Sequence, residues 1–418
     1  MGLEIRTIAE SEVAGWVQAM HTGFHRSQLI SPEEVALSRP GYDLDRTRGA
    51  FDGDRCVGTF RSMARDLTVP GGGSVPASAV TNVTVTATHR RRGLATRMMA
   101  ADLAAAKERG EAVSILIAAE YPIYGRYGFG PATWVTDWEI DVPRAALDSR
   151  HAGPDPADGT IELVTGAEVR AVGPALHERV RTTTAGAISR DSRWWDRATG
   201  ALVLPSFGFQ EPFFAVYRNA AGEVDGMAAY RVNDPHWPGK LPNADAEVVG
   251  HLAATPAAEA ALWRHLLSLD WVVRLRTDHR PPDDILPLLL GDPRAARTEA
   301  YADFMWLRLL DIPAALSARG YAPVSADLVL DVGDPGGLAG GVFRLETAPG
   351  AEPRCTPAPG TAPDLTLDVA TLARLYLGDE SAARLAALGL LAEHRAGATT
   401  TLDHLFHTPR RPWCPEVF

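Results

Sequence analysis

Strands and helices alternate along the first third of this chain, as the spacing of its apolar residues indicates. Residues 79–86 are rich in Val and Thr and lack a helical period, so they predict a strand. The helix that follows is expected to begin near Gly93 and to stop at Gly110. Further strands are expected at residues 3–7, 56–69 and 113–118, and a helix at residues 10–25. The pattern indicates a mixed fold of the α+β class.

The same order of elements returns in the middle of the chain. Strands are expected at residues 213–217, 224–231 and 246–253, before a helix at residues 256–269. This order echoes the first region, so we interpret the middle of the chain as a degenerate second copy. Residues 148–158 have the Ser, Gly, Pro and Asp content of a linker, and a third region is expected from Tyr301. The predicted domains are residues 1–150, 151–300 and 301–418.

The basic turn at residues 89–96 predicts an anion-binding site. It joins the strand at residues 79–86 to the next helix, and the free N–H groups at a helix start attract anions. Gly93 lets a ligand approach the backbone, and Arg90 and Arg91 add positive charge, which suits a pyrophosphate. The alternative is that these arginines only cap a surface turn. The equivalent turn of the second copy, residues 253–258, has neither arginine nor glycine, so no such site is expected there.

Composition and charge narrow the classes of protein. The 418 residues exceed one ordinary domain, and no apolar run approaches the roughly 18 residues of a membrane span. The start of the chain lacks the pattern of a secretion signal, so a cytoplasmic location without a membrane partner is expected. Cys56, Cys355 and Cys414 are far apart, which argues against a disulfide framework and a zinc site, and no metal is expected. The net charge of −11 disfavours nucleic acid and favours a cationic small molecule.

Two motifs resemble a known family. The Arg-x-x-Gly-x-Ala turn from Arg90 to Ala95 resembles the GCN5-related N-acetyltransferases (GNATs), which bind acetyl-CoA at this turn. The string Ile-Tyr-Gly-Arg-Tyr-Gly-Phe-Gly-Pro-Ala at residues 123–132 is similar to one family among them, the Eis (enhanced intracellular survival) N-acetyltransferases. Residues 309–320, 354–357 and 375–378 and the terminal Phe418 also resemble that family. The resemblance implies tandem GNAT domains, a C-terminal domain like a sterol carrier protein, and a homohexamer.

The resemblance also implies an activity, the direct transfer of an acetyl group from acetyl-CoA to a primary amine. Neither a Gly-x-Ser-x-Gly elbow nor a Cys-His nucleophile context supports a covalent acyl-enzyme. Backbone N–H groups around residues 83–85 are expected to stabilise the developing oxyanion, because a strand edge that splays from its neighbour offers fixed donors. The residues expected to bind acetyl-CoA are Val83, Val85, Arg90, Arg91, Gly93, Leu94, Ala95 and Thr96.

Two residues are expected to move protons. Through the match of residues 123–126, the resemblance assigns Tyr124 as the general acid that protonates the departing thiolate, with Tyr127 as the second candidate. It assigns the terminal carboxylate of Phe418 as the base, since an alkylammonium with a pKa of about 10.4 must lose a proton before it attacks. The alternatives are an aromatic core residue for Tyr124 and a frayed chain end for Phe418.

The amine itself is the least determined part of the interpretation. Family members acetylate aminoglycosides, some at more than one position, in an acidic cleft. Here Arg26 stands where an acidic residue is usual, and Asn82 where an aromatic residue is common. The expected substrate contacts are His25, Arg26, Asn82 and Glu416. Polyamines, arylalkylamines and lysine side chains are alternative acceptors, and a non-enzymatic, lipid-binding scaffold is the rival from another class.

Overall fold

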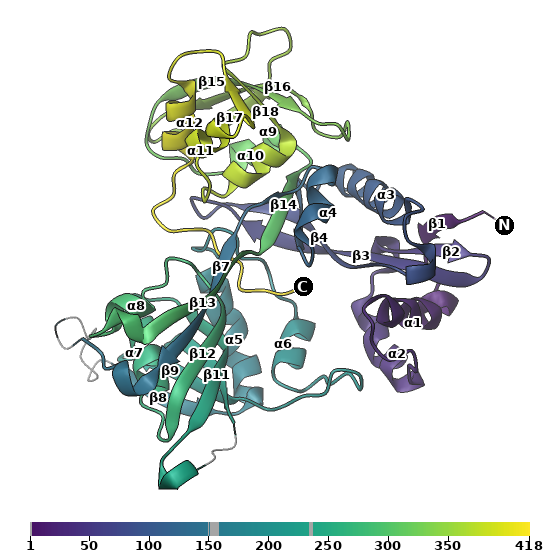
Figure 1. Ribbon diagram of the computed structural model, residues 1–418. Helices are drawn as coiled ribbons and strands as arrows, with labels where there is room; N and C mark the ends of the chain where they lie inside the picture. Colours follow the sequence, from purple (N-terminus) through teal and green to yellow (C-terminus); the bar gives the residue numbers. More distant parts are fainter. Residues whose placement is uncertain (1, 149, 151–158, 234–236) are drawn as a thin grey trace.

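Three β-sheets with their helices form the protein (Figure 1). The structure is a computed structural model, and it describes residues 2–148, 150, 159–233 and 237–418. Each of the three regions of the chain, N-terminal, middle and C-terminal, is built around one sheet (Figure 1). The end of the chain returns to the space between the N-terminal and middle regions (Figure 1).

The first sheet has seven strands in the order β1-β2-β3-β4-β5-β14-β6. Its strands are β1 (Glu4–Thr7), β2 (Thr47–Asp52), β3 (Arg55–Thr68), β4 (Ser74–Val85), β5 (Val113–Ile117), β14 (Met305–Leu309) and β6 (Gly130–Pro131). The strand predicted at residues 79–86 is the second half of β4, which pairs with β5 in parallel. Helix α3 therefore makes the crossover between two parallel strands.

Helices cover both faces of this sheet. Helices α1 (Val13–Gly23) and α2 (Pro32–Ser38) lie on one face, and α3 (Leu94–Glu108) lies on the other (Figure 1). Phe60 of β3 packs in the same buried cluster as Met98 and Leu103 of α3. The helix predicted at residues 10–25 is shorter than expected, because residues 10–12 form a separate 3-10 turn.

The second sheet repeats this plan in the order β13-β7-β12-β11-β10-β9-β8. Its strands are β13 (Ala296–Asp303), β7 (Trp134–Asp141), β12 (Val272–Arg280), β11 (Ala244–Ala253), β10 (Val224–Val232), β9 (Phe213–Asn219) and β8 (Gly159–Val164). Helices α5 (Gly166–Arg181) and α6 (Ser192–Ala198) share one buried cluster, and α7 (Pro256–Leu267) and α8 (Leu286–Leu289) share another. The strands and helix predicted for the second copy are all present.

The third sheet has the order β17-β16-β15-β18-β19. Its strands are β17 (Arg354–Pro357), β16 (Gly341–Thr347), β15 (Ala326–Gly333), β18 (Leu365–Asp368) and β19 (Leu391–Glu393). The helices of this region are α9 (Ile312–Ala318), α10 (Val369–Tyr376), α11 (Ala382–Ala387) and α12 (Ala398–Phe406). Helix α10 packs against β14, so the third core is continuous with the edge of the first sheet.

Two strands are exchanged between the regions that the sequence predicts. Strand β7, from the region predicted as residues 1–150, lies between β13 and β12 in the second sheet. Strand β14, from the region predicted as residues 301–418, lies between β5 and β6 in the first sheet. Hydrogen bonding thus crosses both predicted boundaries, because each sheet takes one strand from a neighbouring stretch of chain. Most of the predicted linker, residues 149 and 151–158, lies outside the described residues.

The exchange predicts that a substitution in β7 or β14 destabilises the sheet that contains the strand, even though most of that sheet comes from another region of the sequence. Trp306 of β14 is 1% exposed in the core beneath α3, and Ile140 of β7 is fully buried in the core of the second sheet. Truncating a buried Trp to Ala costs about 3–5 kcal/mol, and truncating a buried Ile to Ala costs about 2–5 kcal/mol. We expect Trp306→Ala to lower amide hydrogen-exchange protection in β4 and β5, and Ile140→Ala to lower it in β11 and β12. Loss confined to each residue's own stretch of sequence would contradict the exchange.

Candidate active site

The first sheet opens between β4 and β5. Their pairing ends at Val80 and Leu116, although β4 continues to Val85. A β-bulge causes the bend, since Asn82 and Val83 together face one residue of β3, and Asn82 adopts a left-handed φ of 53°. Asparagine tolerates this conformation better than most residues. The strand end is therefore splayed from its neighbour, as expected.

The open edge presents backbone donors. Thr86 donates its N–H to the Val57 carbonyl of β3 at 2.9 Å, so the N–H groups of Val85 and Val83 point to the opposite edge, toward the gap. Strand pairing leaves these groups free to bind an extended ligand or a developing oxyanion.

The start of α3 lies beyond this gap and is uncapped. Gly93 is its N-cap residue, with φ 73° and without a side-chain hydrogen bond to the helix. Within the described part of the chain, the N–H groups of Leu94, Ala95 and Thr96 have no hydrogen-bond acceptor. A Cβ added to Gly93 would meet no atom within 4 Å, and Arg90 and Arg91 are exposed beside it. The geometry fits a pyrophosphate on free amides beside cations.

Two tyrosines line the same region. Tyr124 ends α4 (Tyr121–Tyr124) and is half-buried, with its ring 6.3 Å from Phe129 and 6.5 Å from Trp306. Burial raises the pKa of Tyr124, and Glu120 and Tyr127 add to the effect. The Tyr127 hydroxyl is instead 3.1 Å from Thr96 Oγ1, in the first turn of α3. The turn with the two tyrosines thus touches the helix start.

A residue of the exchanged strand supports this turn from below. The Arg308 guanidinium of β14 is 1% exposed and pairs with Asp334 of the third region at 2.7 Å. A Cβ on Gly128 would lie 1.6 Å from Arg308 Nη1, and Gly128 has φ 81°. Only glycine fits this position, so the tyrosine turn rests directly on a buried ion pair with the third region.

The C-terminal tail docks instead of fraying. Trp413 donates its backbone N–H to Ala185 at 2.7 Å and its indole N–H to the His279 carbonyl at 2.6 Å. Cys414 is fully buried, and Phe418 is half-buried against the hydrophobic core. Figure 1 shows the tail passing from the third region across the second to end beside the first sheet. Among the described residues, no cationic side chain lies within 4 Å of the terminal carboxylate.

Glu416 is the charged anchor of this tail. Its Oε1 lies 3.1 Å from both His177 Nε2 and Arg190 Nε, and its Oε2 faces the Ile188 N–H at 3.5 Å. Burial would raise the pKa of Glu416, but the hydrogen bond from His177 and the charge of Arg190 outweigh it and lower the pKa. Both oxygens are buried and bonded within the protein, and contact of Glu416 with the amine stays a prediction.

The other predicted substrate contacts are spread around the first sheet. His25 is exposed and has φ 56°, and Arg26 donates its N–H to His21 at 2.8 Å, which ends α1 in a Schellman motif. The Arg26 guanidinium lies 4.5 Å from the ring of Phe207 in the second region. Asn82 forms the bulge. Direct contact of His25, Arg26 and Asn82 with the amine stays a prediction.

The second sheet has the same opening, but it is filled. Pairing of β11 with β12 ends at Val248 and Thr277, and beyond it Arg280 Nη1 donates to the His251 carbonyl at 3.4 Å. The helix start is capped, because Thr255 accepts from the Ala258 N–H and Pro256 has no N–H to offer. The chain thus leaves one helix start free for an anion and closes its counterpart.

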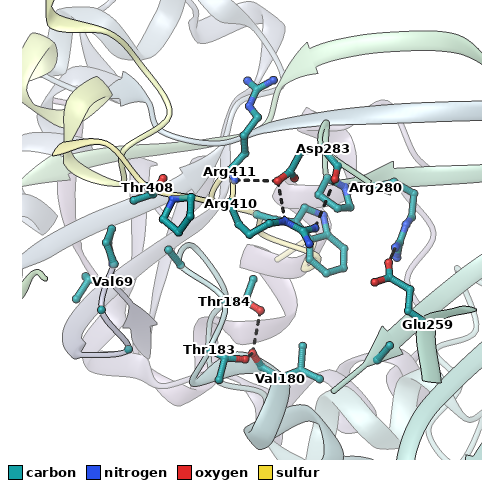
Figure 2. A pocket seen from close by; sticks show the side chains of 18 of the residues that line it. Val69, Val180, Thr183, Thr184, Glu259, Arg280, Asp283, Thr408, Arg410 and Arg411 are labelled. Atoms are coloured by element: carbon teal, nitrogen blue, oxygen red, sulfur yellow. Dashed lines mark hydrogen bonds and ion pairs between the residues drawn. The ribbon is translucent and has the colours of Figure 1, made fainter. Parts of the chain in front are cut away.

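A cavity of about 340 Å³ remains beside this closed site. It lies between the β3–β4 turn, the end of α5 and residues 408–413 of the tail. Figure 2 shows Asp283 held by Arg410 and by the backbone of Arg411, with Glu259 beside Arg280. The polar side chains of the cavity are thus paired mainly with each other.

The partners of the Glu416 anchor were not predicted from the sequence. His177 and Arg190 lie 239 and 226 residues from Glu416, and neither sits in a recognisable motif. The hydrogen bond between Thr96 and Tyr127 was not predicted either, although both residues were named as site candidates.

Family models match nearly the whole chain. The model of the acetyltransferase (GNAT) domain matches residues 4–132, and a second model of that description matches residues 186–309. The model of the sterol carrier protein domain matches residues 312–415. The predicted fold, two GNAT domains followed by a domain like a sterol carrier protein, is confirmed. The protein is therefore an N-acetyltransferase of the GNAT class, and GNAT enzymes use acetyl-CoA.

Relatives identify the family within this class. An uncharacterized N-acetyltransferase of Streptomyces avermitilis is 56% identical over 100% of this chain and 99% of its own. N-acetyltransferase Eis of Mycobacterium tuberculosis is 36% identical, with 91% of each chain covered. Eis1 of Mycobacterium abscessus is 30% identical, with a TM-score of 0.84 over 99% of this chain and 100% of that one. The chain belongs to the Eis family of N-acetyltransferases.

Two kinds of feature are absent from the described residues. None of the helices there combines the length and apolar character needed to cross a membrane. The described part of the chain likewise holds no group of three His, Cys, Asp or Glu side chains arranged for a metal ion.

Because Glu416 anchors the tail through buried charges, we expect the free energy of unfolding to depend on this side chain and on pH. Glu416→Gln leaves Arg190 buried without a carboxylate, so we expect the free energy of unfolding to fall by about 3–5 kcal/mol at pH 7. Burial also lowers the pKa of His177 below 6.5, so unfolding takes up protons and the anchor weakens as the pH falls below 6.5 and then through the lowered pKa of Glu416.

Urea unfolding between pH 7 and pH 3 measures this effect. The difference between wild type and Glu416→Gln should persist down to about pH 4.5 and shrink only below it, as the pH falls through the lowered pKa of Glu416. The control Glu162→Gln, at a half-exposed ion pair with Arg218, should change the free energy by less than about 1 kcal/mol. An equal effect of both substitutions would contradict the anchor.

Proposed function

We propose that this enzyme transfers an acetyl group directly from acetyl-CoA to a primary amine at the opening of the first sheet. The observation that carries the proposal is the uncapped start of α3 beside the splayed end of β4, since the matching site of the second sheet is closed. Three features meet there: free helix amides that can bind a pyrophosphate, free strand amides that can bind an extended chain, and a tyrosine hydroxyl.

The proposed cofactor contacts divide by chemistry. The N–H groups of Leu94, Ala95 and Thr96, with Arg90 and Arg91, hold the pyrophosphate, and Gly93 gives it room. The free edge at Val83 and Val85 pairs with the extended arm and stabilises negative charge on the acetyl oxygen.

Tyr124 and the terminal carboxylate of Phe418 are proposed to handle the protons. The raised pKa of Tyr124 keeps its hydroxyl protonated at neutral pH, so the hydroxyl donates to the departing sulfur. The carboxylate of Phe418, docked beside the first sheet without a cationic partner within 4 Å among the described residues, accepts the proton of the amine. Tyr127 is the weaker candidate for the general acid, because its hydroxyl is hydrogen-bonded to the Thr96 hydroxyl.

The candidate acceptors are aminoglycosides, with acetylation at more than one position, polyamines, arylalkylamines and lysine side chains. All are primary amines, so they share the proposed chemistry. Thiol release from acetyl-CoA, measured across a panel of these amines, tests the proposal. The scaffold alternative predicts no thiol release and no acetyl-CoA binding.

Acetyl-CoA binding at the α3 start should depend on Gly93. A hundredfold excess of ligand over its dissociation constant stabilises a protein by about 2.7 kcal/mol, which a thermal shift detects. Gly93→Val places a side chain into the open space at the helix start and should abolish the shift. Gly110→Val is the matched control, because Gly110 ends the same helix with φ 79° and also faces open space. Its shift should persist, and an equal loss in both variants would contradict the assignment.

Turnover should depend on the Tyr124 hydroxyl. Tyr124→Phe removes only the proposed acid and should lower kcat by about 10²- to 10⁴-fold, with little change in acetyl-CoA binding. Tyr127→Phe is the matched control and should keep most of the turnover. The reverse result would move the role to Tyr127.

A further inference from the structure

Arg61 lies on the face of the first sheet opposite α3. Its neighbours in β3 define the faces, since Phe60 packs with α3 and Ser62 donates to Asp102 of α3 at 3.0 Å. Successive side chains of a strand alternate, so Arg61 and Met63 point to the other face. Met63 and Phe418 both pack against the large hydrophobic core that joins the first and third sheets. Arg61 therefore lies on the face of the first sheet that carries α1 and α2, opposite α3.

The polar partners of Arg61 are neutral. Its Nη2 donates to the Gly41 carbonyl at 2.5 Å, and its guanidinium lies 4.9 Å from the ring of Tyr42. Its Nε is buried and has no hydrogen-bond acceptor within the described residues. Burial lowers the pKa of Arg61 to about 10, and Arg65 and Arg193 contribute, yet the side chain stays a cation at neutral pH.

A second guanidinium stands beside it. Arg193 of α6 donates to the Leu37 carbonyl, and its Nε lies 2.6 Å from the position of a Cβ on Gly41. Arg61 and Arg193 thus both contact Gly41, which brings two cations from two domains together. Like charges raise each other's free energy unless an anion lies between or beside them.

The acidic side chains near this pair are engaged elsewhere. Asp191 pairs with Arg65 at 2.7 Å and caps α6 through the Trp194 N–H. Glu34 accepts from the Ser206 N–H at 2.8 Å and lies 4.0 Å from His21. Within the described ranges, no carboxylate, the terminal one included, lies within 4 Å of Arg61 or Arg193. Asp191 attracts both guanidinium groups through space, but the described residues give neither of them a direct carboxylate partner.

This pair lies close to the proposed point of acetyl transfer. Arg61 faces Thr81 of β4, and Val83 follows two residues later in the same strand. The bulge at Asn82 lies between Thr81 and Val83, so the backbones of Arg61 and Val83 are within about 10 Å of each other. A molecule of a few bonds spans that distance.

We propose that the acceptor is an amine that also carries an anionic group, and that Arg61 and Arg193 bind this group while the amine meets the acetyl carbon. The proposal rests on the proposed function and specifies its substrate class. A carboxylate accepts two parallel hydrogen bonds from one guanidinium, and a phosphate does the same. Arg26 and Arg197, whose guanidinium groups lie 4.5 and 5.6 Å from the ring of Phe207, extend the positive region. Polyamines and aminoglycosides place further cations against it.

Three amines of equal length test the proposal, since they differ in the charge of the far end. They are 5-aminopentanoate (anionic), pentylamine (neutral) and cadaverine (cationic). We expect kcat/KM in thiol release to fall in that order, with at least about tenfold between the first and the last. The ratio should narrow with added salt. Replacing 5-aminopentanoate by 3-aminopropyl phosphate decides whether the site prefers carboxylate or phosphate.

Substitutions of Arg61 and Arg193 test whether these two residues cause the preference for an anionic acceptor. Arg61→Gln and Arg193→Gln should each reduce the ratio of 5-aminopentanoate to cadaverine by about tenfold, and Arg61→Lys should keep part of it. Arg344→Gln, at an exposed ion pair of the third region, changes the net charge equally and should leave the ratio unchanged. Thermal shift with acetyl-CoA checks that each variant is folded.

The outcomes separate this inference from the proposed function. Equal or better use of cadaverine, or a preference that both glutamine variants retain, overturns the inference while acetyl transfer stands. If no amine releases thiol, the proposed function fails, and the thermal shift of the CoA-bound protein with each amine then decides the preference for an anionic group. A larger shift with 5-aminopentanoate, lost in Arg61→Gln, supports it, and equal shifts overturn it.

Discussion

The buried charge of Glu416 fixes the position of the tail that meets all three domains. A buried carboxylate costs several kcal/mol unless its partners are well placed, and here His177 and Arg190 supply them from the second domain. Trp413 adds two hydrogen bonds to the same domain. These contacts hold the tail on its course across the second domain. The second domain thus serves the first by guiding this segment.

The two GNAT domains keep the same architecture and differ where an anion would bind. Both have a parallel pair of central strands that separate toward one end. In the first domain a glycine opens the following helix and leaves its amides free, whereas in the second a threonine and a proline occupy those positions. Arg280 then fills the gap between the strands. A few side chains decide whether the helix start of each domain is open, as in the first, or closed, as in the second.

Local signals in the sequence predicted most elements and the glycine-containing turn between β4 and α3. The β-branched strand, the glycine at the helix start and the Tyr-Gly string act over a few residues, so their pattern survives without knowledge of the fold. Strand partners are different, because residues 305–309 have the pattern of any buried strand, and their place between β5 and β6 depends on distant pairing. The partners of Glu416 could not be predicted for the same reason, since they lie more than 200 residues away.

The exchanged strands have a consequence for how such a gene can change. Each of the first two sheets is completed by a strand encoded at a distance, β7 for the second and β14 for the first. Recombination between two related genes near residue 150 or 300 would join a sheet from one parent to an interior strand from the other. The core faces of both strands must then match a foreign partner. Selection should therefore preserve the three domains as a single inherited block, and shuffling of individual domains should be rare.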